Sequence, residues 1–236
     1  MGSEQIFLGR LGKPVLTPLF LALALPAMAG RPLSTDDASV LEEGRCQLEA
    51  WVDRSRGATA VWAVPACNVG LGIEWQVGAA RTREAGQSRF AEAYVQGKKV
   101  FLQPDRHFVG AGLVAGVARR PLNERHRGWQ NPFIGIPLTH NLNETTFVHG
   151  SVGWQRDREA DRQVTTWGLA IETAINPSWA VLAEAYGANR DRPYFRAGVR
   201  WSVIASQLDV DLSAVTRSGG TQSDRLISLG FTYATP

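Results

Sequence analysis

Apolar and polar residues alternate with a period of two along most of the chain that follows Gly44. Over residues 71–79 the odd positions hold Leu, Ile, Trp, Val and Ala, whereas the even positions hold Gly, Glu, Gln and Gly. The same alternation returns over residues 109–117, 165–175, 195–203, 208–213 and 227–233. Successive side chains of a β-strand point to opposite faces, so this pattern predicts strands with one apolar face and one polar face.

Counted in this way, the chain holds about twelve strands of roughly ten residues each. They are predicted at residues 45–55, 58–68, 71–82, 89–103, 107–119, 129–139, 145–157, 163–175, 178–189, 193–205, 207–217 and 225–234. A transmembrane β-strand needs about 9–11 residues, whereas strands of soluble proteins have a mode near 5–6. We therefore predict an all-β fold, a closed antiparallel up-and-down transmembrane β-barrel of about 12 strands over residues 44–236.

The connections between these strands alternate in length. The even-numbered connections are mostly short turns, at residues 68–70, 104–106, 176–178 and 205–207. The odd-numbered connections are mostly longer and more charged, at residues 84–88, 119–128, 157–162, 189–192 and 218–224, whereas the first, at Arg56-Gly57, is tight. Outer-membrane barrels have short periplasmic turns and longer external loops, so we expect both termini on the periplasmic side.

Residues 1–29 have the parts of a cleaved secretory signal peptide in the usual order. Arg10 and Lys13 supply positive charge, residues 15–25 are apolar, and Ala27-Met28-Ala29 forms a small-x-small cleavage site. The apolar run is much shorter than the ~20 residues of a membrane-spanning helix, and a buried N-terminal helix is the alternative. We expect export to the outer membrane of a Gram-negative cell, with residues 30–43 as a polar periplasmic lead-in.

The polar face of the predicted strands carries many ionisable side chains, which would be costly in a dry core. In a water-filled barrel they would line the lumen. Alternation alone does not decide which face is inside, so a soluble periplasmic lipid-binding barrel with an apolar interior is the alternative. The predicted lumen-lining residues are Glu49, Glu74, Glu92, His149, Glu172, Glu184, Arg196, Arg200, Asp209 and Asp211.

The only two cysteines are Cys46 and Cys67, and export would bring them into an oxidising compartment. If Arg56-Gly57 is a two-residue turn, they lie directly opposite each other in the first hairpin. They would then form a non-hydrogen-bonded pair, whose Cα atoms are about 4.5 Å apart. We expect a disulfide that pins the register of this hairpin, and two unlinked thiols are the alternative.

Several short motifs resemble those of a known family. The motifs GRCQLE at 44–49, NPFIG at 131–135 and INPSW at 175–179 occur together with a final strand, LISLGFTY, at 226–233. They are similar to the MetA-pathway-of-phenol-degradation outer-membrane proteins, over nearly the whole mature chain and by pattern more than by a sharp motif. The resemblance implies an outer-membrane location, passage of small and often apolar or aromatic molecules, and no catalytic residues. The chain departs from the usual ending, because Ala234-Thr235-Pro236 follow the aromatic Tyr233 that the barrel-assembly machinery would read.

Composition and charge exclude other classes of protein. The chain is 44% hydrophobic and 20% charged, which is too apolar for a disordered protein. The net charge is only +3, and lysine occurs just at Lys13, Lys98 and Lys99, so no nucleic-acid partner is expected. His107, His126 and His140 lie at turns or in a loop without metal-ligand spacing, so we expect neither a metal nor a cofactor.

A catalytic site is not expected either. His149 and Ser151 share one strand face and Glu172 lies on the next strand, but side chains at i and i+2 are about 7 Å apart, too far for a base to reach a nucleophile. The chain contains no G-x-S-x-G motif. A lipid-active outer-membrane hydrolase is therefore kept only as an alternative to a protein that is not an enzyme.

The charged side chains of neighbouring strands indicate the function. Arg200 is predicted to lie opposite Asp211, with Glu184 nearby, and rings of such side chains filter solutes in channels. We expect passive transport or binding of a small solute, and a non-conducting structural or surface-interaction barrel is the alternative. Expected partners are outer-membrane lipids, lipopolysaccharide near the basic loop at residues 119–127, and the barrel-assembly machinery during insertion.

Overall fold

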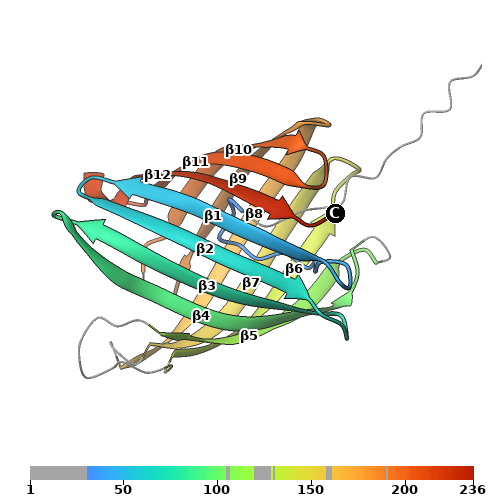
Figure 1. The fold of residues 1–236 in the computed structure, drawn as a ribbon, viewed down its shortest axis with the longest axis horizontal. Helices are drawn as coiled ribbons and strands as arrows, with labels where there is room; N and C mark the ends of the chain where they lie inside the picture. The colour runs from blue at the N-terminus through green and yellow to red at the C-terminus, as the bar shows by residue number, and fades with distance from the viewer. Residues whose placement is uncertain (1–30, 105–106, 120–128, 130, 158–160, 190) are drawn as a thin grey trace, which may run out of the picture.

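The computed structural model describes residues 31–236 except 105–106, 120–128, 130, 158–160 and 190, so the predicted signal peptide lies outside the described residues. The described residues form twelve strands that close into one antiparallel barrel, in which each strand pairs with its neighbours in sequence and the last pairs with the first (Figure 1). The strands are β1 Cys46–Ser55, β2 Ala58–Asn68, β3 Ile73–Glu84, β4 Gln87–Leu102, β5 Gly110–Arg119, β6 Asn131–Asn141, β7 Thr146–Asp157, β8 Arg162–Asn176, β9 Trp179–Ala188, β10 Tyr194–Ile204, β11 Leu208–Arg217 and β12 Leu226–Ala234. This confirms the predicted all-β fold and strand number.

The apolar face of the strands points outward. On β3, the side chains of Trp75 and Val77 are 50% and 49% exposed, whereas Glu74 on the other face of the same strand is 3% exposed. The same alternation holds on β10, where Phe195 is 47% exposed and Arg196 is 8% exposed. The soluble lipid-binding alternative requires the apolar face inside, so the observed orientation is the opposite of what it needs.

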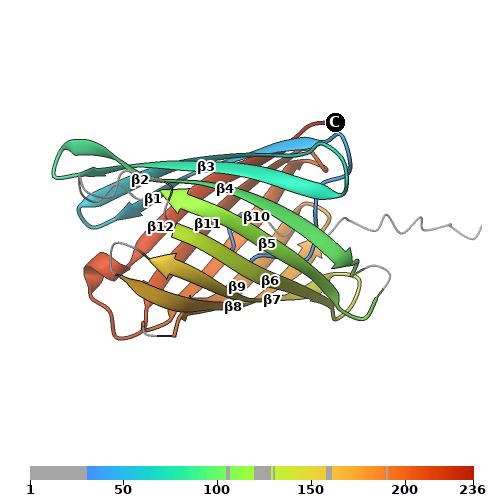
Figure 2. The same cartoon turned by 90° about the horizontal axis from the view of Figure 1, so that it is seen from below.

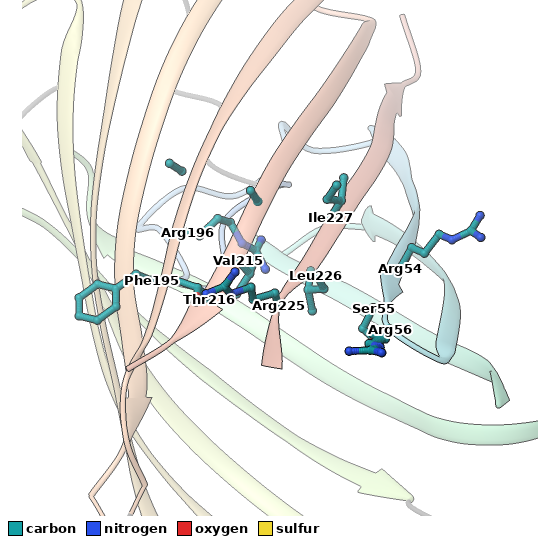
Figure 3. Close-up of a pocket in the computed structure, with 12 residues that line it drawn as sticks. Arg54, Ser55, Arg56, Phe195, Arg196, Val215, Thr216, Arg225, Leu226 and Ile227 are labelled. Atoms are coloured by element: carbon teal, nitrogen blue, oxygen red, sulfur yellow. The ribbon is translucent and has the colours of Figure 1, made fainter. Parts of the chain in front are cut away.

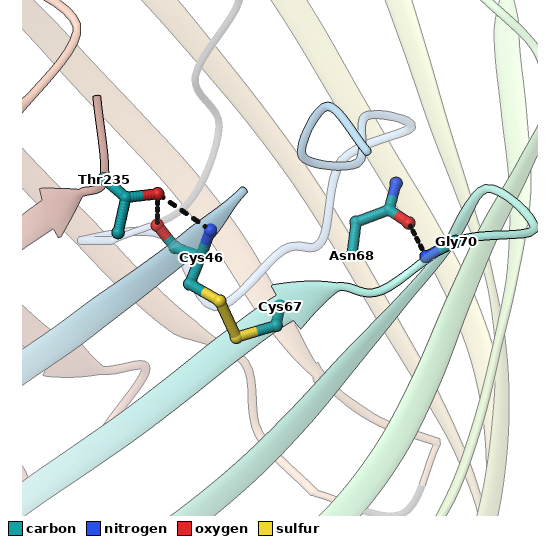
Figure 4. The surroundings of a disulfide bond; sticks show 5 residues. All are labelled: Cys46, Cys67, Asn68, Gly70 and Thr235. Atoms are coloured by element: carbon teal, nitrogen blue, oxygen red, sulfur yellow. Dashed lines mark hydrogen bonds between the residues drawn. A yellow bond between two sulfur atoms is a disulfide. The ribbon is translucent and has the colours of Figure 1, made fainter. Parts of the chain in front are cut away.

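The barrel closes where β1 meets β12, and the first hairpin is crosslinked next to this seam (Figure 4). Cys46 and Cys67 are register partners and form a disulfide with a Cα–Cα distance of 4.1 Å, as predicted. The Cys46 backbone N–H donates to Thr235 Oγ1 at 3.0 Å, and the Thr235 N–H donates to the Cys46 carbonyl at 2.8 Å. The crosslinked end of β1 is thus also hydrogen-bonded to the end of the chain.

One predicted loop is absent. The segment 84–88 was expected as a longer loop, but β3 runs to Glu84 and β4 begins at Gln87. Ala85 and Gly86 form a two-residue turn, and both have positive φ, 47° and 82°. A two-residue hairpin with positive φ at both positions matches the twist of the flanking strands, so pairing continues to the end.

Residues 31–43, which belong to the predicted polar periplasmic lead-in, reach β1 from within the barrel. In both views the blue segment that leads to β1 runs inside the ring of strands (Figures 1 and 2). Arg31 is 6% exposed, Thr35 3%, Asp37 1% and Ala38 0%. The physical reason is that the inward strand faces offer charged and hydroxyl partners, whereas this polar segment has no strand pattern of its own. In the part of the chain that the structure describes, no helix is long and apolar enough to cross a membrane.

Candidate functional site

The predicted lumen-lining residues all occupy inward positions in the strand alternation. Except for Glu92, which is of intermediate exposure, each is at most 9% exposed. They come from β1, β3, β4 and from β7 to β11, so the charged surface surrounds much of the lumen. Residues 31–41, which we call the N-terminal segment, contact this surface at several points.

Arg31 binds the wall formed by β1, β11 and β12. Its Nη2 donates to Asp211 Oδ1 at 3.0 Å and to Ser228 Oγ at 2.8 Å, and its backbone N–H donates to Glu49 Oε1 at 3.2 Å. The guanidinium carbon also lies 4.3 Å from the centre of the Trp51 ring, within the range of a cation–π contact. One side chain of the segment therefore joins three strands.

Glu184 on β9 binds the next part of the segment. Its Oε2 accepts hydrogen bonds from the Thr35 backbone N–H and from Thr35 Oγ1, both at 2.9 Å, and its Oε1 accepts from the Ser34 N–H at 2.9 Å. Arg196 Nε lies 3.3 Å from Glu184 Oε1. The carboxylate is thus satisfied by the segment and by its strand neighbour together.

The part of the wall formed by β3, β4 and β6 binds the remainder of the segment. Lys98 Nζ lies 3.0 Å from Asp36 Oδ1 and 2.9 Å from Asp37 Oδ1. The Ala38 N–H donates to Thr139 Oγ1 at 2.9 Å. The Leu41 N–H donates to Glu74 Oε2, also at 2.9 Å. These contacts lie on β3, β4 and β6, so the segment spans the lumen between opposite walls.

The predicted register of Arg200 opposite Asp211 is present. Arg200 Nη1 donates to Glu172 Oε1 on β8 at 2.5 Å, and its Nη2 donates to the Arg31 carbonyl at 2.6 Å. Asp211 in turn forms its ion pair with Arg31. The segment is therefore part of the charge pairing of the wall and does not merely fill space.

Two inward glycines make room for the segment. A Cβ at Gly230 would lie 2.8 Å from Arg31 Nη2, and a Cβ at Gly168 would collide with Thr35 Oγ1. Other inward glycines are covered by wall side chains, since Gly78 lies under Tyr94 and Gly116 under Phe133. The space that inward glycines leave is thus occupied at these positions.

Carboxylates outnumber cationic groups on the inward face of the strands. Among the strand side chains that the structure describes, the inward carboxylates are Glu49, Asp53, Glu74, Glu84, Glu92, Glu172, Glu184, Asp209 and Asp211, against Arg89, Lys98, Arg162, Arg196, Arg200 and Arg217. Arg31 adds a positive charge, whereas Asp36 and Asp37 add negative ones. In channels, an excess of negative side chains along the path favours cations over anions.

His149 does not form a nucleophile–base pair with Ser151 in the contacts of the described residues. It is 1% exposed, and its Nδ1 lies 3.0 Å from Thr139 Oγ1, the same hydroxyl that accepts from Ala38. No group of three or more His, Cys, Asp or Glu side chains among the described residues is placed to hold a metal ion.

Sequence reasoning missed the segment and some of its partners, namely Arg31, Thr35, Asp36, Asp37, Lys98, Thr139 and Ser228. Lys98, Thr139 and Ser228 could have been found, because the alternation places them on the inward face of their strands. The segment itself has no periodic pattern of apolar and polar residues, so the alternation could not predict its contacts.

Comparison with known proteins identifies the family. The family model described as "Uncharacterised conserved protein UCP029691" matches residues 19–235, so the chain belongs to that family. No curated protein matches the chain. The predicted likeness to the MetA-pathway-of-phenol-degradation proteins stays a prediction.

Solved structures share the fold. The KdgM porin in complex with disordered oligogalacturonate has a TM-score of 0.65 and 8% identity, over 80% of this chain and 99% of that chain. The NanC porin has a TM-score of 0.56 and 8% identity, over 80% and 98%. The COG4313 outer membrane channel from Pseudomonas putida F1 has a TM-score of 0.55 and 10% identity, over 86% and 100%. At these identities the likeness establishes the fold alone.

Proposed function

We propose that this member of the UCP029691 family is an outer-membrane channel that passes or binds a small solute without catalysis. The observation that carries the proposal is a closed barrel with an apolar outer face and a charged inner face. An apolar band on the outside suits lipid, and charged side chains inside select solutes. The porins and the channel with similar folds support the proposal as an analogy of fold.

The charge of the lumen favours a neutral or cationic solute. Carboxylates exceed cationic groups on the wall, and an anion would be repelled by them. The KdgM structure contains oligogalacturonate, an acidic ligand, so the wall described here suits a different kind of molecule. An apolar or aromatic solute, which the family resemblance implies, stays a prediction.

The N-terminal segment supports the second candidate, a non-conducting barrel with a structural or surface-interaction role. Its Arg31 pairs with Asp211 on one wall, and its Asp37 pairs with Lys98 on another. Thr35 binds Glu184 between them, so the segment obstructs the lumen. We favour a channel because these bonds are made by one short segment, whose local release would open the path without unfolding the barrel.

The proposed location includes an export signal at residues 1–29 and both termini on the periplasmic side. The barrel-assembly machinery would then read the end of β12, where Tyr233 faces outward with 43% exposure. The basic loop near residues 119–127 lies mostly outside the described residues, so its proposed contact with lipopolysaccharide rests on sequence alone.

Single-channel recording in planar bilayers tests the proposed function. The full chain and a variant lacking residues 31–41 are compared, and a heat-dependent mobility shift in electrophoresis checks that both are folded. We expect a small conductance in the full chain, a larger one in the variant, and a reversal potential that indicates cation preference. If neither protein conducts although both are folded, the channel proposal is wrong and the non-conducting barrel stands.

A further inference from the structure

A hollow of about 620 Å³ lies near one end of the barrel, where β1 ends and β12 begins (Figure 3). Its lining comes in groups of three consecutive residues from β1, β10, β11 and β12 and the adjoining turns, at 54–56, 195–197, 214–216 and 225–227. In each group the middle residue occupies an inward position or its continuation, and the two flanking residues are exposed. Eight of the twelve lining residues are therefore exposed on the outer face of the barrel or on its continuation into the adjoining turns.

The floor of the hollow is apolar and its edge is cationic. Ala197 and Ala214 are register partners with small side chains, and Phe195 and Ile227 rise beside them with 47% and 60% exposure. Arg54 is the register partner of Ile227. Arg225 precedes Leu226, the first residue of β12, so it lies diagonal to Arg54 on the same outer face.

These two arginines are exposed, and among the described residues neither forms an ion pair. Arg56, in the adjoining turn, donates from Nη1 to Gln222 Oε1. An Arg on the lipid face costs about 2–4 kcal/mol at the midplane and about 0–1 near the interface, so these residues suit the headgroup level. There a guanidinium binds phosphate oxygens through two parallel hydrogen bonds.

The charge pattern of the outer face extends beyond the hollow. Where side chains are described, strand carboxylates occupy inward positions, whereas outward arginines gather at the end of the barrel where β1, β3, β5 and β7 finish: Arg54, Arg81, Arg83, Arg119 and Arg156. Outward tryptophans lie at both ends: Trp154 is close to Arg156 at the arginine end, whereas Trp75, Trp179 and Trp201 lie at the opposite end, the last two stacked with ring centres 5.7 Å apart. Both ends thus carry aromatic residues suited to a membrane interface, and the outward arginines add positive charge at one end, which complements a polyanionic lipid surface.

We propose that this hollow binds a phosphorylated lipid of the outer leaflet, of the lipid A class, with its phosphate on Arg54 and Arg225 and an acyl chain over Ala197 and Ala214. In such a lipid the phosphate is close to the acyl chains. The cationic edge of the hollow is likewise close to its apolar floor. This binding is independent of conduction, since none of these side chains faces the lumen.

The binding is tested by native mass spectrometry of protein reconstituted in phosphatidylcholine vesicles that contain bisphosphorylated lipid A, after gentle extraction. We expect retained lipid A on the unmodified chain and an about tenfold or larger loss with Arg54→Gln plus Arg225→Gln, because two charge-assisted contacts disappear. Ala214→Trp, which fills the floor without changing charge, also reduces retention.

Arg89→Gln is the matched control. Arg89 lies at the same end but already pairs with Glu84 at 2.9 Å, so its replacement leaves retention unchanged. Dephosphorylated lipid A and oleate serve as competing probes and should displace little lipid A. Equal retention of phosphorylated and dephosphorylated lipid, equal competition by oleate, or unchanged retention in the folded double variant would overturn the proposal.

Discussion

Lys98 Nζ lies 2.9 Å from Asp37 Oδ1 inside the barrel, and only 6% and 1% of the two side chains are exposed. Lys98 belongs to β4, whereas Asp37 belongs to the N-terminal segment. This pair connects the segment to the wall opposite the site where Arg31 is bound. The state of the lumen therefore depends on bonds that a single substitution can remove.

Replacing Lys98 by Met should release the far side of the segment. Removing one partner of a buried ion pair costs roughly 3–5 kcal/mol, and here Asp36 and Asp37 would both be left without their ammonium partner. We expect higher single-channel conductance and faster proteolysis at residues 31–41. Lys99→Met is the matched control, since Lys99 Nζ donates to the Leu71 carbonyl outside the lumen.

Replacing Gly230 by Val should displace Arg31 without changing any charge. The added Cβ would lie 2.8 Å from Arg31 Nη2 and 2.8 Å from Trp51 Cβ. We expect conductance to rise, because Arg31 can no longer approach the wall. Gly135→Ala is the inward control, since a Cβ there has no neighbour closer than 3.7 Å. Unchanged conductance in a folded Gly230→Val variant would mean that the segment does not limit the path.

Replacing Asp209 by Asn should weaken the preference for cations. Asp209 Oδ1 accepts a hydrogen bond from Ser202 Oγ at 2.6 Å, which Asn can retain while the negative charge is lost. Charged side chains along a pore set its ion selectivity. The reversal potential in a salt gradient, recorded with the variant lacking residues 31–41, should move toward zero. Ser213→Ala, an uncharged change on the same face, should leave it in place.

Replacing Cys46 and Cys67 by Ser should lower stability. The disulfide spans a sequence separation of 21, and a loop of that size contributes about 3 kcal/mol by chain entropy. Because the strands also pair directly, we expect a loss of no more than this value. Urea unfolding of the barrel in lipid with and without reductant measures the effect, and the reductant should not change the double variant.

The alternation of the sequence was sufficient to predict the barrel and much of its register. Trp75 and Glu74 fall on opposite faces because a strand has a period of two, and this local rule holds wherever the strand is placed. The Arg56-Gly57 turn sets the register of the first hairpin, so the pairing of Cys46 with Cys67 could be predicted by counting. The tight turn at Ala85-Gly86 was missed because charged residues around it resembled a loop.

The contents of the lumen were decided by the tertiary structure. Arg31 and Ser228 are 197 residues apart in sequence, and Thr35 and Glu184 are 149 apart. The N-terminal segment has no periodicity, and its side chains find partners only after closure of the barrel brings distant strands around it. Sequence by itself determined which residues share a face, because that depends on local backbone geometry. Which inward charges pair with one another, and which pair with the segment, depends on distances across the closed barrel and only the tertiary structure sets these.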